Sequence, residues 1–241
     1  MTASTTHRPL LGWLWSSDYG LHLLLISLLA AMFVAPALVA ARVLHPIAVD
    51  VFFSVVVVSG VMAVAGRRVP VVTILLALVT IAVRWAHLGL ATPRLAIIDG
   101  VFSAVMVAIL AVLILAQVFR AGPVTVHRIE GAVAVYLLIG VLWGTAYRVV
   151  AILEPAAFMT SLGPLTDAAS LYYFSFVTLT TVGFGDIIPV TQAARGLTMV
   201  QALTGQLYPA ILIARLVSLQ ILSSQQPEPP APPDRQDSDP A

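Results

Sequence analysis

The chain has 241 residues, 60% of them hydrophobic and 10% charged, and its mean hydropathy is +1.00. A soluble domain cannot bury so much apolar surface, so this composition predicts a protein that lies largely in lipid. The net charge of +1, without a basic cluster, gives no sign of a nucleic-acid partner, and the absence of cysteine excludes disulfides, thiolate chemistry and cysteine-ligated metals.

Long apolar runs predict six membrane-spanning helices, at residues 21–41, 46–65, 69–90, 95–119, 129–153 and 191–222. Each holds roughly 20 residues or more, which is enough to cross a hydrocarbon core of about 30 Å. Residues 168–180 form a shorter apolar run, which at about 1.5 Å per residue reaches only roughly 20 Å. This run predicts a re-entrant helix, which enters the membrane and returns to the same side. The predicted fold class is an all-α membrane protein.

Arginines in the short loops give the predicted orientation. With a cytoplasmic N-terminus, Arg8, Arg67, Arg68, Arg120 and Arg128 lie in the cytoplasm, and Arg42, Arg94 and Arg195 lie outside. Both termini are then cytoplasmic, in a multi-pass protein of the cell membrane, of the bacterial inner-membrane type. A cleaved signal peptide is the alternative for the first run, but that run is longer than the apolar core of signal peptides.

Charged residues inside the predicted helices are few, because a lone charge in lipid is costly. Asp50, Arg84 and Asp99 fall at a similar depth, so we expect Arg84 to pair with Asp99 or Asp50. Pairing favours a structural role in the helix bundle, with a ligand or ion site as the alternative. The fourth helix lacks the arginine series that a voltage sensor needs, since Arg94 precedes it and Arg120 follows it.

The five histidines lie far apart along the chain, at His7, His22, His45, His87 and His127. No two of them have the close spacing that metal ligands on one helix show. We therefore expect no cofactor and no resident metal site.

The sequence Thr-Leu-Thr-Thr-Val-Gly-Phe-Gly-Asp-Ile-Ile-Pro occupies residues 178–189, between the re-entrant helix and the last span. Gly183 and Gly185 permit the backbone to alternate its handedness, so that successive carbonyl oxygens point the same way. Non-helical backbone at membrane depth is tolerated only where protein buries it or where it lines a water-filled path. Four copies of this segment around an axis would present rings of oxygen atoms to a cation.

This segment resembles the selectivity filter of the tetrameric potassium-channel family, and of bacterial two-helix pore domains in particular, with Phe184 in place of the usual tyrosine. The resemblance covers about residues 129–222 and runs in order through 180–186, Pro189 and Thr191. It implies an outer helix at 129–153, a pore helix at 168–180, a filter at 181–185 and an inner helix at 191–222. One filter in the chain implies a homotetramer.

By this resemblance the transported ion is K⁺, and the filter consists of Thr181, Val182, Gly183, Phe184 and Gly185. The carbonyl groups of Thr181, Val182, Gly183 and Phe184, with the Thr181 hydroxyl, would replace the hydration shell of the ion. The partial negative charge at the carboxyl end of the pore helix would favour a cation there.

Two aromatic residues of the pore helix are expected to support the filter. Tyr173 and Phe174 stand where the family usually has two tryptophans, and we expect Tyr173 to hydrogen-bond Asp186 of its own or a neighbouring subunit. Asp167, together with Thr166, is expected to cap the start of this helix.

The inner helix contains two candidate hinge residues. Gly205 stands at the gating hinge of the family, and Pro209 follows four residues later. Proline removes a helix hydrogen bond and clashes with the preceding turn, so we expect a bend near residue 205. Close packing at Gly205 without movement is the alternative. We expect Gln201 and Gln206 to face the central cavity or to bond between helices.

Three other functions share parts of this pattern. A non-selective cation channel has the same fold, but such members typically lose the aromatic residue or a glycine of the filter. A potassium transporter strings four degenerate filters along one chain, whereas this chain has one. An intramembrane aspartyl protease would need Asp186, in the Gly-x-Gly-Asp sequence at 183–186, to share a proton with Asp99.

The expected organisation has four parts. They are a cytoplasmic N-terminus with interfacial aromatics (1–20), a four-helix transmembrane domain that is not a functional voltage sensor (21–122), a pore domain (123–224) and a disordered proline-rich tail (225–241). The predicted function is passive conduction of K⁺, and not enzymatic catalysis. The expected partners are other copies of the chain, K⁺ and the lipid bilayer.

Overall fold

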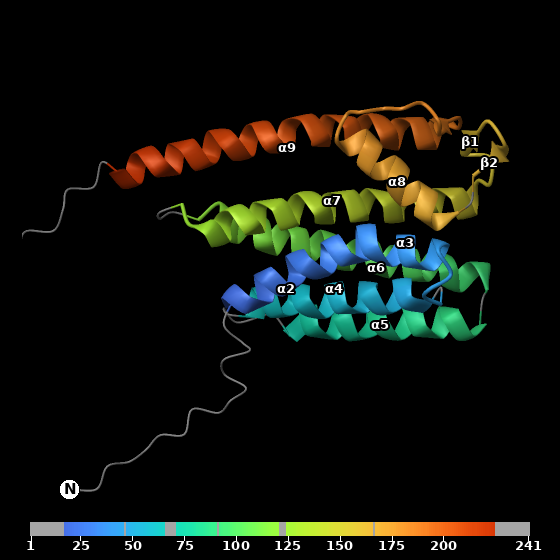
Figure 1. The fold of residues 1–241 in the computed structure, drawn as a ribbon, viewed down its shortest axis with the longest axis horizontal. Helices are drawn as coiled ribbons and strands as arrows, with labels where there is room; N and C mark the ends of the chain where they lie inside the picture. The colour runs from blue at the N-terminus through green and yellow to red at the C-terminus, as the bar shows by residue number, and fades with distance from the viewer. Residues whose placement is uncertain are drawn as a thin grey trace, which may run out of the picture.

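The computed structural model describes residues 17–45, 47–65, 71–90, 92–120, 124–165 and 167–224, and these form an all-α protein (Figure 1). Six of its helices are long and apolar enough to cross a membrane, and a seventh apolar helix is shorter. These properties make the chain a multi-pass membrane protein, as the sequence predicts.

The helices in chain order are α2 (Ser17–Leu29), η1 (Ala30–Val34), α3 (Ala35–Ala40), α4 (Ile47–Ala65), α5 (Val71–Leu90), α6 (Pro93–Val118), α7 (Val126–Leu153), α8 (Ala168–Leu179) and α9 (Gln192–Ser224). Three short strands, β1 (Phe158–Thr160), β2 (Gly163–Pro164) and β3 (Ile188–Pro189), form an antiparallel sheet in the order β2-β1-β3. This sheet joins the loop before α8 to the loop before α9.

The first predicted span is not one uniform α-helix. It divides into α2, the π-helical turn η1 and α3, and Pro36 lies in the first turn of α3. Because proline cannot donate to the carbonyl four residues earlier, a wider turn is a common way for a helix to continue past it. The predicted starts at residues 46 and 69 lie outside the described residues, as do residues 1–16 and the tail 225–241.

The fourth span begins earlier than predicted, at Pro93. Thr92 caps it, because the Thr92 hydroxyl accepts a hydrogen bond from the Leu95 amide at 3.4 Å, and Pro93 occupies the first turn, where its missing N–H costs nothing. Arg94 therefore lies inside the first turn of α6 and not before the helix, which corrects the sequence prediction. The rest of α6 still contains no arginine.

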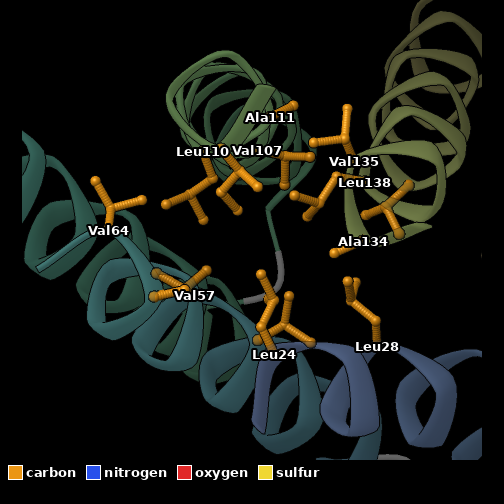
Figure 2. Close-up of a cluster of buried hydrophobic side chains, with 14 of the residues drawn as sticks. Leu24, Leu28, Val57, Val64, Val107, Leu110, Ala111, Ala134, Val135 and Leu138 are labelled. Atoms are coloured by element: carbon orange, nitrogen blue, oxygen red, sulfur yellow. The ribbon is translucent and has the colours of Figure 1, made fainter. Parts of the chain in front are cut away.

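The main core lies between α2, α4, α6 and α7 (Figure 2). It is built from aliphatic side chains that are almost fully buried: Leu24, Leu28, Val57, Val107, Leu110, Ala134, Val135 and Leu138. These side chains come from both the four N-terminal helices and the predicted outer helix of the pore. The N-terminal bundle is thus packed firmly against α7.

Helix α8 crosses obliquely between α7 and α9 (Figure 1). Two glycines of α7 make room for it. A Cβ atom at Gly140 would lie 2.8 Å or less from the ring of Phe176, and one at Gly144 would lie 2.8 Å from Cε1 of Tyr172. Since Tyr172 and Phe176 are four residues apart, they occupy one face of α8 and fit the two gaps on α7.

Helix α9 forms one outer layer of the molecule (Figure 1). It packs on α7 and α8, but large apolar side chains along the rest of its length are exposed in the chain that the structure describes: Met199, Val200, Leu203, Leu207, Ile211, Ile213 and Val217. Lipid or further protein is the natural cover for such a surface.

Candidate functional site

The loop that follows α8 has an alternating backbone. Thr181, Gly183 and Gly185 have positive φ angles of 60°, 58° and 77°, whereas Val182 and Phe184 between them do not. The alternation inferred from the glycine spacing is therefore present, and it also includes Thr181. A β-branched residue at positive φ is uncommon and costs about 1–3 kcal/mol, so the surrounding structure must impose it.

Hydrogen bonds from the loop to the end of α8 hold this conformation. The Thr181 amide donates to the Thr178 carbonyl at 3.0 Å, and the amides of Val182 and Gly183 both donate to the Val177 carbonyl at 3.0 and 3.3 Å. The chain therefore turns sharply at the carboxyl end of the helix. That end has partial negative charge, which favours a cation beside it.

The alternating loop is exposed along its whole length in the single chain. Val182 is 55% exposed and Phe184 is 69% exposed, although both are apolar. Residues 180–186 as a group have no cover from the described part of the chain. Irregular backbone between membrane helices is tolerated where other protein buries it or where it lines a water-filled path.

Helix α8 is fixed at both ends. At its start Asp167 accepts a hydrogen bond from the Ser170 amide at 2.8 Å, as predicted, while Thr166 lies outside the described residues. At its end the Leu179 carbonyl accepts a hydrogen bond from the Tyr136 hydroxyl at 3.3 Å. Because the loop leaves directly from the end of α8, the Tyr136 bond also helps to fix where the loop begins.

A buried polar network holds the middle of α8 between α7 and α9. Gln201 of α9 is fully buried, and its Nε2 donates to the Ser175 carbonyl and to Ser175 Oγ, each at 2.8 Å. The Tyr147 hydroxyl donates to Gln201 Oε1, and Ser175 Oγ donates to the Gly140 carbonyl at 2.7 Å. Gln201 thus bonds between helices, one of its two expected roles, whereas Gln206 is exposed.

The two aromatic residues expected to support the filter face different surroundings. Phe174 is buried, and its ring packs with those of Tyr147 and Phe158 at centroid distances of 5.2 and 5.5 Å. Tyr173 is exposed, and its hydroxyl lies close enough to the Asp186 carboxylate of the same chain for the two groups to interact, so the expected hydrogen bond stays a prediction. Of these two aromatic residues, Tyr173 thus lies near the residue that ends the loop, whereas Phe174 packs in the interior.

Gly205 lies against the end of α8. A Cβ atom at this position would lie 2.9 Å from the carbonyl carbon and 3.2 Å from the Cα atom of Leu179, and still closer to the Leu179 oxygen. Pro209, four residues later in α9, removes the amide that would otherwise donate to the Gly205 carbonyl. A larger residue than glycine would clash with the Leu179 backbone, so close packing explains why position 205 is a glycine. The role of Gly205 as a hinge stays a prediction.

The charges inside the N-terminal helices form one network with α7. Arg84 Nη2 lies 2.8 Å from Asp50 Oδ1, and Arg84 Nη1 lies 3.5 Å from Asp99 Oδ2. Arg84 therefore pairs with both of its predicted partners, and its guanidinium also lies 4.2 Å from the ring centroid of Phe53. Asp99 further pairs with Arg148 of α7.

Sequence reasoning missed Arg148. Arg148 lies within the predicted span 129–153, so its charge also needs a partner inside the membrane. Its place inside that span is the signal in the sequence that points to it. With Arg148 the network has two aspartates and two arginines and is neutral, which is the arrangement that buried charges need.

The protease alternative needs two aspartates that face each other, and the structure gives Asp99 and Asp186 separate surroundings. Asp99 is buried and paired with Arg84 and Arg148. Asp186 is exposed beside Tyr173, and its carboxylate accepts a hydrogen bond from the Ile187 amide at 3.1 Å. Neither carboxylate is arranged to share a proton with the other.

Comparison with known proteins gives a family match and similarity to curated proteins. Residues 133–220 match the profile of a family described as "Ion channel". A protein of Oryza sativa subsp. japonica, "Two pore potassium channel c", is 37% identical over 83 residues, which cover 34% of this chain and 17% of that protein. The Arabidopsis thaliana protein "Two-pore potassium channel 4" is 46% identical over 55 residues, 23% of this chain and 19% of that protein. No solved structure gives a significant match.

The matched residues run from α7 to α9 and include the alternating loop. The chain covers only 17% and 19% of the length of these two curated relatives. Ion channels are not enzymes, so the similarity supports a channel and gives no support to the protease alternative.

Proposed function

We propose that four copies of this chain form a potassium-selective channel, which conducts K⁺ passively through a filter at residues 181–185. The single observation that carries the proposal is the alternating backbone, with positive φ angles at Thr181, Gly183 and Gly185. Left- and right-handed conformations in turn direct successive carbonyl groups to one side, as a row of cation ligands requires. The similarity to an ion-channel family and to two potassium channels supports the same function.

The proposed ligands are the carbonyl oxygens of Thr181, Val182, Gly183 and Phe184, with the Thr181 hydroxyl. Five residues of extended chain span at most about 16–18 Å, and this alternating backbone is shorter. That length holds several ions in single file, whose mutual repulsion permits fast conduction. Gly185 completes the alternation at the outer end, next to Asp186, which interacts with Tyr173.

The proposed homotetramer follows from the single loop in each chain. A ring of ligands around an axis needs several copies of that loop, and four chains with cyclic symmetry supply them. The exposed side chains of Val182 and Phe184, and the uncovered apolar face of α9, support contact with other copies. The expected partners are therefore other copies, lipid and K⁺.

In this proposal the four N-terminal helices are a bundle fixed to the pore and not a voltage sensor. Arg84 is held by Asp50 and Asp99, and α6 has an arginine only in its first turn. A charge that is bonded in place on α5 cannot supply the movement of several charges that voltage gating requires. The proposed orientation keeps both termini in the cytoplasm, so that the filter opens outward.

Flux into and out of proteoliposomes tests this function. Vesicles that contain the purified protein are loaded with K⁺ and diluted into Na⁺, and a potential-sensitive dye reports the membrane potential. A K⁺-selective channel makes the interior negative, whereas a non-selective channel produces no lasting potential. A K⁺ ionophore added afterwards verifies that the vesicles are intact.

Two glycine variants provide a matched comparison in the same assay. Gly183→Ala places a side chain at a positive φ inside the filter, and Gly163→Ala does so at a φ of 121° in the β1–β2 hairpin. Within the described chain a Cβ atom at either position would meet no atom within 4 Å, so both variants test the backbone and not packing. We expect Gly183→Ala to abolish the potential and Gly163→Ala to retain it. Equal loss in both variants would refute the assignment of the filter.

A further inference from the structure

Two histidines that are far apart in the sequence meet in the fold. The rings of His22 in α2 and His127 in α7 lie in a T-shaped arrangement with centroids 5.4 Å apart, and Glu130 of α7 contacts both. His22 Nε2 is 3.1 Å from Glu130 Oε1, and His127 Nδ1 is 3.4 Å from Glu130 Oε2. Their spacing along the sequence does not show this proximity, because tertiary packing of α2 on α7 brings the two side chains together.

We propose that His22, His127 and Glu130 form a binding site for a divalent first-row transition metal of the Zn²⁺ type. Imidazole nitrogen and carboxylate oxygen are suitable ligands for such an ion, and two histidines with one glutamate are a known zinc-binding set. One ligand atom from each of the three side chains can be chosen so that all lie within 4.8 Å of one another.

The distances fit a metal as well as a hydrogen bond. Zinc binds nitrogen and oxygen at about 2.0–2.2 Å, so tetrahedral coordination separates neighbouring ligand atoms by about 3.3–3.6 Å. The separations of 3.1 and 3.4 Å between the histidine nitrogens and the Glu130 oxygens are close to these values. Small side-chain rotations would therefore complete the site without movement of the helices.

The helix positions make the site rigid on one side. His127 and Glu130 are three residues apart in α7, so they lie on the same face of that helix. His22 comes from α2, which packs closely there, because a Cβ atom at Gly131 would lie 3.8 Å from Cδ2 of Leu21. A bound ion would thus tie α2 to α7.

The site is open to solvent. The His22 and His127 side chains are 49% and 45% exposed, and Glu130 is 19% exposed. An ion has access from outside, and water can occupy its remaining coordination positions. The nearby start of α7 has partial positive charge, which lowers the affinity for a cation, so the three ligands must outweigh it.

The location suggests how such an ion affects the rest of the chain. Two residues after Glu130, the Ala132 carbonyl accepts a hydrogen bond from the Tyr208 hydroxyl of α9 at 2.7 Å. At the same end of the molecule, Arg215 of α9 donates to the Phe119 carbonyl at 3.1 Å. The second half of α9 is bonded to the start of α7 through Tyr208. A metal that fixes the start of α7 therefore also restrains α9.

The test uses the full-length purified chain without an affinity tag of histidines. Co²⁺ is titrated into the protein in detergent, and the visible absorption of ligated Co²⁺ is followed, then Zn²⁺ is added as competitor. We expect one Co²⁺ per chain, displacement by Zn²⁺, and a rise in the unfolding temperature with either metal. This readout is independent of ion conduction, so its failure leaves the proposed channel function untouched.

Variants separate the proposed site from other histidines. We expect His22→Ala, His127→Ala and Glu130→Gln each to weaken Co²⁺ binding at least ten-fold, and His45→Ala, at an exposed histidine outside the cluster, to leave it unchanged. Unfolding temperatures without metal verify that each variant folds. Equal Co²⁺ binding by the wild type and a His22→Ala/His127→Ala double variant would overturn the proposal and leave only a hydrogen-bonded cluster.

Discussion

Replacing Gly205 with alanine distinguishes close packing from hinge movement on α9. The added Cβ atom would lie 2.9 Å from the Leu179 carbonyl carbon and closer to its oxygen, inside the 3.0 Å that real Cβ atoms respect. The atoms that it meets belong to the backbone at the end of α8, where the Tyr136 hydroxyl also bonds. Backbone cannot rotate away as a side chain can, so α8 and α9 must separate.

The expected magnitude combines two opposing terms. Adding a methyl group to a filled site costs about 1–3 kcal/mol, whereas glycine to alanine inside a helix stabilises by about 0.5–1 kcal/mol. With the upper value for a clash against backbone, the net loss for Gly205→Ala is about 2 kcal/mol, or roughly thirty-fold in the unfolding equilibrium. The separation of α8 from α9 should also displace the loop at 181–185.

The matched control is Gly196→Ala in the same helix. A Cβ atom there would meet no atom within 4 Å in the described chain, so this variant should be unchanged or up to about 1 kcal/mol more stable. Denaturant unfolding in detergent measures both variants, and proteoliposome flux measures selectivity. If Gly205→Ala is as stable and as selective as Gly196→Ala, and changes only opening, the packing explanation is refuted and the hinge is supported.

Three further variants test the contacts around the loop and the charge network. Asp99→Asn leaves the buried Arg84 and the partly buried Arg148 without a full counter-charge, so it should cost about 3–5 kcal/mol, measured by denaturant unfolding. A loss below about 1 kcal/mol would contradict the network. Tyr147→Phe leaves Gln201 Oε1 without its donor and should cost about 1–3 kcal/mol in the same assay. In a chain that already carries Gln201→Leu, adding Tyr147→Phe should cost much less, because the acceptor is no longer present. Tyr173→Phe removes the bond to Asp186 from an exposed position, so we expect folding to be unchanged and the current to decline faster during sustained recording; an unaltered time course would show that this bond does not support the filter.

Local features were predictable from the sequence because they depend on a few adjacent residues. Apolar length alone gave the six spans and the short α8, within a few residues at most described ends. The spacing of Gly183 and Gly185 predicted alternating handedness, and Asp167 predicted the helix cap. Arg84 needed partners in lipid, and few charges were available to it.

Features that depend on packing between distant helices were not predictable in the same way. Nothing in the sequence near Gly205 shows that the Leu179 carbonyl lies against it. The sequence alone therefore leaves a hinge and close packing as alternatives at Gly205. The meeting of His22 with His127 likewise depends on how α2 crosses α7. Arg148 differs from these cases. Its position inside a predicted span can be read from the sequence, whereas its pairing with Asp99 cannot.

The reversal potential of the current shows whether the alternating loop selects K⁺ over Na⁺. The purified protein is placed in a planar bilayer with K⁺ on one side and an equal concentration of Na⁺ on the other. We predict that the current reverses close to the limit for a membrane permeable to K⁺ alone. A reversal near zero would contradict selectivity and leave a non-selective cation channel of the same fold.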